Sequence, residues 1–172
     1  IIHSFAEMTA EKMKKAPFPD PLDADRYVDL RRLINQYGGE YFIGADISGT
    51  LFEPAYHLCS MENLMMDLAD SGEKADILLD RLLEFSLSVS LEAVRMGIDW
   101  IWLGDDMGTQ VSMLLSPAMW RQHFKPRMQR IIQSLRTENP DIIIAYHSCG
   151  SIYPIIEDLV EIGIDVLNPL QE

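Results

Sequence analysis

Two hydrophobic patterns alternate along the chain: short apolar runs and longer stretches with apolar residues at helical spacing. The short runs predict four strands, at residues 40–47, 99–103, 141–147 and 165–168. The helical spacing predicts the main helices, at residues 25–37, 61–68, 73–96, 116–136 and 152–162. Strands that alternate with amphipathic helices are typical of βα units around a parallel sheet, so the pattern predicts an α/β fold.

Two of the predicted helices end in the same way. Gly97 and Gly163 each stand where a left-handed helix cap belongs, and Ile-Asp follows each glycine into the next strand. Four strands with their helices make about half of a (β/α)₈ barrel, which typically needs ~250 residues. We therefore expect a partial TIM barrel, a single domain over residues 1–172 that is a fragment of a longer chain. A doubly wound open sheet is the alternative, but no Gly-rich phosphate loop follows the first strand.

Polar residues follow each predicted strand at its carboxyl end. In a parallel barrel this end carries function, whereas the opposite end serves stability. Asp99 and Asp165 enter strands, and we expect them to stabilise turns. The residues at the exits are Asp46, Asp105, Asp106, His147, Cys149, Asn168 and Gln171. We expect these side chains to share one cavity.

The sharpest chemical signal is the pair His147 and Cys149. Residues two apart on an extended backbone point to the same side, and imidazole nitrogen and thiolate sulfur are both good zinc ligands. A catalytic zinc site needs a third protein ligand, expected from another strand exit or from outside the chain; Cys59 is not expected to supply it. The alternative is a buried cysteine and a hydrogen-bonded histidine near a helix start.

The adjacent Asp105 and Asp106 are candidate catalytic residues, as a general acid/base or as a cation clamp. Because neighbouring side chains point in different directions, we expect one to face the cavity and the other to accept from backbone amides. A solvated turn is the alternative. Asp46 is the third catalytic candidate, and its alternative role is a loop cap for the amides of Ser48 or Gly49.

Three amide side chains at the same end of the sheet are candidates for substrate binding: Gln110, Asn168 and Gln171. The basic residues of the predicted helix 116–136 fit a solvated outer face. The tryptophans and the ten methionines are expected mainly in the core.

Composition narrows the classes of partner. The net charge of −13 argues against non-specific binding to nucleic acid or to an anionic membrane, since both repel an acidic protein. Two cysteines make no disulfide framework and indicate reduced thiols in the cytoplasm. The apolar runs are too short to span a bilayer, and no signal peptide is visible.

Several motifs together resemble the uroporphyrinogen decarboxylase-like superfamily. They are Gly-Asp-Asp-Met-Gly-Thr-Gln at 104–110, Leu-Ser-Pro-Ala-Met-Trp-Arg at 115–121, Tyr-His-Ser-Cys-Gly-Ser-Ile at 146–152, and the segment 163–171. The resemblance covers about residues 40–172. It implies a (β/α)₈ barrel and one of two bacterial-type activities: cofactor-free decarboxylation of a porphyrinogen in haem biosynthesis, or zinc-dependent methyl transfer.

The His-x-Cys pair is similar to the methyltransferase branch. That branch moves methyl groups between a corrinoid (cobalamin) protein and a thiol or folate acceptor, and its usual third zinc ligand is a cysteine that would lie beyond Glu172. The resemblance therefore implies zinc at His147 and Cys149, a corrinoid protein partner, and a small methyl donor or acceptor; an oligomer is compatible with it. The alternatives are a decarboxylase, in which Asp46 or Asp105 stabilises a protonated pyrrole, and a non-catalytic binding module.

Overall fold

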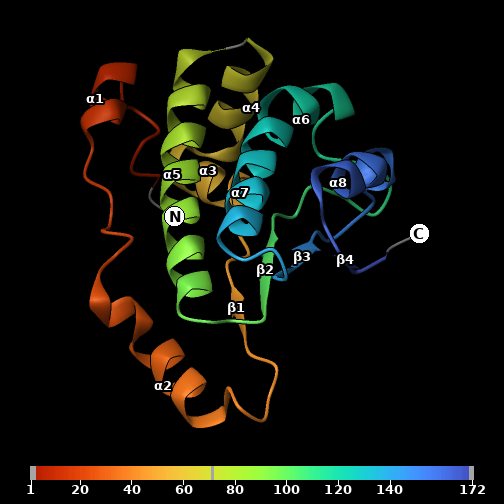
Figure 1. Cartoon of the computed structure of the whole chain (residues 1–172). Helices are drawn as coiled ribbons and strands as arrows, with labels where there is room; N and C mark the ends of the chain where they lie inside the picture. Colours follow the sequence, from red (N-terminus) through yellow and green to blue (C-terminus); the bar gives the residue numbers. More distant parts are fainter. Residues whose placement is uncertain (1–2, 71, 171–172) are drawn as a thin grey trace.

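The computed structural model describes residues 3–70 and 72–170 (Figure 1). Its centre is one sheet of four parallel strands in sequence order. The strands are β1 (Gly44–Asp46), β2 (Trp100–Gly104), β3 (Ile143–His147) and β4 (Val166–Asn168). Within the described residues the sheet does not close on itself. The fold is thus a partial TIM-barrel-like α/β fold, as the sequence predicts.

Helices connect each strand to the next and lie on one side of the sheet (Figure 1). The elements before β1 are α1 (Ala10–Lys15), η1 (Ala24–Tyr27) and α2 (Val28–Tyr37). The connections are α3 (Phe52–Cys59), α4 (Met61–Ala69) and α5 (Glu73–Arg95), then α6 (Pro117–His123) and α7 (Lys125–Glu138), then η2 (Tyr153–Ile155) and α8 (Ile156–Ile162). No helix in the described parts of the chain is long and apolar enough to cross a membrane.

The two faces of the sheet differ in burial. Alternate residues of β2 and β3 point toward the helices and are fully buried: Ile101, Leu103, Ile144 and Tyr146. Several residues of the opposite face remain accessible, although Ala145 is buried. Trp100, Trp102 and His147 are half-buried, and Ile143 and Val166 are exposed. We call this the open face; it corresponds to the inside of a closed barrel.

Two glycines end helices and two aspartates stabilise strand starts, as the sequence predicts. Gly97 and Gly163 have φ angles of +95° and +100°, as left-handed caps require. Asp99 Oδ2 accepts from the Ile43 amide at 2.7 Å, and Asp165 Oδ2 accepts from the Ile144 amide at 2.7 Å. Both carboxylates therefore hold the start of a neighbouring strand, which confirms their structural role.

The predicted strand at residues 40–47 is too long. Only Gly44–Asp46 pairs with β2, and Tyr41 and Phe42 are each 62% exposed. The amides of Glu40 and Tyr41 both donate to the Tyr37 carbonyl, so the chain is still turning there. Apolar composition was a misleading signal because both rings remain largely exposed, with Tyr41 packed only edge-on against Tyr37 at 5.8 Å between ring centres.

The predicted helix 116–136 is two helices. Ser116 caps the first, accepting from the Met119 amide at 3.2 Å. The helix breaks at Phe124 because Pro126 has no N–H to donate to the carbonyl four residues earlier. Helix α5 begins after Gly72, which makes no side-chain cap.

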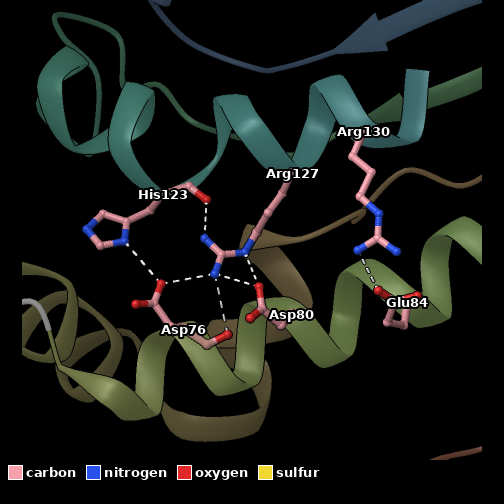
Figure 2. A network of polar contacts seen from close by, with 6 residues as sticks. All are labelled: Asp76, Asp80, Glu84, His123, Arg127 and Arg130. Atoms are coloured by element: carbon pink, nitrogen blue, oxygen red, sulfur yellow. Dashed lines mark hydrogen bonds and ion pairs between the residues drawn. The ribbon is translucent and has the colours of Figure 1, made fainter. Parts of the chain in front are cut away.

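Ion pairs join α5 to the α6–α7 segment (Figure 2). The Arg127 guanidinium lies 3.0 Å from an Asp76 carboxylate oxygen and 2.6 Å from one of Asp80. It also donates to the His123 carbonyl at 2.6 Å. The Arg127 side chain is only 13% exposed, although the side chains of Asp76 and Asp80 are 51% and 63% exposed. This residue therefore fixes the packing of two helices that support the sheet.

Replacing Arg127 with alanine is expected to lower the free energy of unfolding by about 1–2 kcal/mol, because the His123 carbonyl and two half-exposed carboxylates lose a largely buried partner. Arg130 is the matched control. It pairs with Glu84 at 2.6 Å, but the two side chains are 53% and 58% exposed, so Arg130→Ala should cost about 0.5 kcal/mol or less. Urea denaturation of both variants measures the difference, and equal losses would contradict the role given to Arg127.

Candidate metal site at the strand ends

Three side chains with metal-binding atoms meet at the carboxyl ends of β2 and β3. His147 ends β3, Cys149 follows two residues later, and Asp106 lies in the loop after β2. The His147 Nε2 atom is 3.4 Å from Cys149 Sγ and 3.4 Å from Asp106 Oδ1. One ligand atom from each residue lies within 4.8 Å of the others. We call these three residues the donor trio.

Asn168, at the end of β4, orients the histidine. Its Oδ1 atom lies 3.1 Å from His147 Nδ1, and since an amide oxygen only accepts, Nδ1 carries the ring proton. The lone pair of Nε2 then points toward Cys149 and Asp106. Metal-bound histidines commonly have their other nitrogen held in this way.

Hydrogen bonds between two loops hold the trio together. Asp106 Oδ1 accepts from the Cys149 amide at 2.7 Å, and Ser148 Oγ accepts from the Met107 amide at 3.0 Å. The Gly108 amide donates to the Cys149 carbonyl at 3.2 Å. The loops after β2 and β3 therefore form one unit, and Asp106 is placed by contacts that do not depend on a metal.

The surroundings of Cys149 are acidic. Partial burial, the hydrogen bond and charge of Asp106, and the charge of Glu53 together raise the pKa of its thiol. A cation between these groups would act in the opposite direction, because it stabilises the thiolate and neutralises the carboxylate. The carboxylate and the oriented imidazole could thus bind a divalent ion together with a thiol that ionises when the ion binds.

Asp105 points away from this site. It is fully buried, and its carboxyl group accepts from the amides of Leu51 and Glu53 at 3.0–3.1 Å, at the start of α3. Burial raises its pKa from an ordinary 3.8 to about 7, against the opposing effect of these amide bonds. Asp105 is thus the residue that accepts from backbone amides, as expected of one of the pair, whereas Asp106 also accepts from a backbone amide, that of Cys149, and lies beside His147.

The other predicted site residues are more dispersed. Asp46 is exposed, and its Oδ1 accepts from the Ser48 amide at 2.8 Å, which matches the loop-cap alternative. It also borders a cavity of about 580 Å³ between β1, α5 and the N-terminal segment, which none of the donor trio lines. Gln110 is exposed in the loop after β2. Gln171 lies outside the described residues.

The sequence left the roles of two residues here open or misplaced. Asp106 was offered as a general acid/base or a cation clamp without being named as the third zinc ligand, and its place depends on the pairing of Gly104 with His147 across the sheet. Trp102 was expected in the core but stands on the open face, with its ring centre 6.0 Å from that of His147. Successive side chains of a strand point to opposite faces, so Trp102 lies on the face opposite Ile101 and Leu103. This alternation is visible in the sequence and could have predicted the position of Trp102.

Comparison with known proteins identifies the family. The model of the uroporphyrinogen decarboxylase (URO-D) family matches residues 4–169. This chain belongs to the uroporphyrinogen decarboxylase family. No curated protein matches it.

A solved structure of a methyltransferase from Methanosarcina mazei has the same fold. It is similar with a TM-score of 0.67 and 24% sequence identity, over 80% of this chain and 39% of that chain. At this identity the similarity concerns the fold. The present chain spans well under half the length of the methyltransferase.

Proposed function

We propose that this URO-D family chain contributes the metal-binding part of a zinc-dependent methyltransferase. The reaction would move a methyl group between a corrinoid protein and a thiol or folate acceptor, in either direction. In this proposal residues 1–172 form one domain, part of a longer (β/α)₈ barrel. The observation that carries it is the donor trio, with imidazole, thiol and carboxylate within 4.8 Å of one another at the functional end of the sheet.

The residues fit zinc by the chemistry of their donors. Nitrogen, sulfur and carboxylate oxygen are the atoms that bind zinc in proteins, and catalytic sites combine three protein ligands with one open position. Cys149 is exposed, so a substrate can reach the same place. Asp106 fills the third position from within the chain, whereas the resemblance placed the third ligand beyond Glu172.

Each residue has a distinct task in this proposal. Bound zinc supplies Lewis acidity, which lowers the pKa of an acceptor thiol and keeps it nucleophilic at neutral pH. Asn168 fixes the tautomer of His147, and Asp106 links the loop of Cys149 to the loop after β2. The exposed ends of the strands leave access for a corrinoid protein carrying the methyl group. Free thiols at Cys59 and Cys149 fit a cytoplasmic location.

Decarboxylation of a porphyrinogen is the second candidate, favoured by the family model itself. It would need arginines for the acidic side chains of the substrate and an accessible carboxylate for the pyrrole. The segments that follow the strands, 47–51, 105–116, 148–152 and 169–170, contain no arginine or lysine. Asp105 is buried against backbone amides. Of the two carboxylates considered for the pyrrole, only Asp46 is exposed, and the donor trio is the observation that favours methyl transfer.

Metal binding tests the proposal directly. We expect the purified chain to bind about one zinc ion per molecule, as four-coordinate protein sites do, and to show cobalt–thiolate absorption after cobalt replaces zinc. Cys149→Ser should remove that absorption and most of the bound metal, and Asp106→Asn should weaken zinc binding about tenfold or more.

Cys59→Ser is the matched control because Cys59 is buried and burial raises the pKa of its thiol to about 11. This variant should retain full metal content by elemental analysis. Loss of metal in Cys59→Ser with retention in Cys149→Ser would refute the assignment. A folded chain that binds no zinc, corrinoid or porphyrin would favour a non-catalytic module.

A further inference from the structure

The loop after β2 and the loop after β3 fit together along their backbones beside the donor trio. Besides the three hydrogen bonds that hold the trio together, the Ser151 amide donates to the Thr109 carbonyl at 2.7 Å. Both loops therefore donate and accept, and the pairing of β2 with β3 continues beyond the ends of the strands. We call the two segments, residues 106–109 and 148–151, the loop clasp.

Two glycines bring the backbones of the clasp into direct contact. A Cβ atom on Gly108 would lie 2.6 Å from the Gly150 carbonyl carbon and 2.6 Å from the Ser151 nitrogen. A Cβ atom on Gly150 would in turn overlap the Gly108 backbone. These are all backbone atoms, so no rotation of a side chain would make room. Gly108 does not have a positive φ angle, so it is the approach of the other loop that requires glycine at this position.

Ser148 ties the clasp to the sheet. Its side chain is fully buried, and its Oγ atom accepts from the Met107 amide at 3.0 Å and donates to the Cys149 carbonyl at 3.2 Å. The Ser148 amide donates to the Asn168 carbonyl, at the end of β4, at 3.1 Å. A buried polar group that loses its partner is costly. Ser148 therefore opposes separation of the two loops and connects them to the strand that orients His147.

The clasp determines the spacing of the donor atoms because Asp106 and Cys149 belong to its two halves. In a tetrahedral zinc site with bonds of about 2.0–2.3 Å, neighbouring ligand atoms lie about 3.3–3.6 Å apart. His147 Nε2 lies 3.4 Å from Cys149 Sγ and 3.4 Å from Asp106 Oδ1, which is within this range. A larger ion has longer bonds and needs its ligand atoms further apart. The spacing thus fits a small four-coordinate ion.

We propose that Gly108, Ser148 and Gly150 are positioning residues for the metal site. They hold Asp106 and Cys149 at the spacing of a small ion before that ion binds, and they thereby favour zinc over larger ions. This effect on metal selectivity rests on the proposed function. The clasp itself consists of contacts between protein atoms, so its integrity can be measured without a metal.

Gly108→Ala tests the selectivity. We expect it to weaken zinc binding about tenfold or more, because the added methyl group separates the two halves of the clasp. Cadmium prefers the same ligand atoms but is larger, so the ratio of zinc affinity to cadmium affinity should fall about threefold or more. A general loss of stability would lower both affinities alike. Competition with a chromophoric chelator measures both values.

Gly39→Ala is the matched control, because Gly39 has no positive φ and nothing lies within 4 Å of the position its Cβ atom would take. This variant should keep both affinities. Ser148→Ala removes the acceptor of the Met107 amide without adding a clash. It should lower the zinc to cadmium ratio in the same direction, and it remains informative if Gly108→Ala does not fold.

Amide hydrogen exchange of the metal-free chain tests the clasp itself. We expect the amides of Gly108, Cys149 and Ser151 to exchange at least about tenfold more slowly than in an unfolded chain, and Gly108→Ala to remove this protection. Unprotected amides in the unaltered chain, or an unchanged zinc to cadmium ratio in both Gly108→Ala and Ser148→Ala, would overturn the proposal. Protected amides in a chain that binds no zinc would refute the metal site and leave the clasp standing.

Discussion

Gly104→Ala is expected to destabilise the folded chain by about 3 kcal/mol or more and to disrupt the donor trio. Gly104 ends β2 with a φ angle of +133°, a conformation that residues with a Cβ atom rarely adopt. A Cβ atom there would lie 2.1 Å from the His147 carbonyl oxygen and 2.6 Å from the His147 nitrogen. Both are strand backbone atoms, so the clash cannot be relieved by turning a side chain.

Gly104→Ala would also disturb the residues that follow β1. The Gly104 carbonyl accepts from the amides of Gly49 and Thr50 at 2.8 and 3.0 Å, and its amide donates to Thr50 Oγ1 at 2.9 Å. Separating β2 from β3 at this residue therefore moves His147 away from Asp106 and disturbs the start of α3. We expect weaker zinc binding together with the loss of stability, measured by metal analysis and urea denaturation.

Gly97→Ala is the matched control for Gly104→Ala, because it introduces the same kind of backbone strain without a steric clash. Gly97 also has a positive φ, +95°, but nothing lies within 4 Å of the position its Cβ atom would take. Its replacement should cost only about 1 kcal/mol and leave zinc binding unchanged. If Gly104→Ala were no more harmful than Gly97→Ala, the contact between β2 and the His147 backbone would not constrain the site.

The order of strands and helices could be predicted because it depends on local periodicity. Short apolar runs, helical spacing and the two Gly-Ile-Asp junctions are all contained within a few neighbouring residues. The position of His147 and Cys149 at a strand exit followed from the same information. The limits of the first strand did not, because Tyr41 and Phe42 have strand-like composition but remain exposed.

Features that depend on contacts distant in sequence could not be predicted in the same way. Helix α3 begins after Leu51, which has no capping side chain, so its start carries no local signal. Its cap is the carboxyl group of Asp105, 54 residues further along the chain. Asp106 becomes a metal-ligand candidate for a similar reason, since only the register of β2 on β3 brings it to His147.

Replacing Asp105 is expected to give the second large effect. Asp105→Ala would leave the buried amides of Leu51 and Glu53 without their acceptor, at a cost of about 3 kcal/mol in unfolding free energy. Asp105→Asn keeps one acceptor oxygen at the same place, so its cost near neutral pH should be much smaller. Urea denaturation of both variants checks this order, and a loss of similar size in both would contradict the capping role.

The same carboxyl group makes stability depend on pH. Burial raises its pKa from 3.8 to about 7, so between these values the folded chain retains a proton that the unfolded chain releases. Folded-state stability should therefore fall as pH rises through this window, by about 2–4 kcal/mol from this group. Asp105→Asn cannot ionise and should lack this component, so its stability relative to the unaltered chain should improve from pH ~4.5 to ~7.5. An identical pH dependence in both proteins would show that Asp105 ionises normally despite its burial.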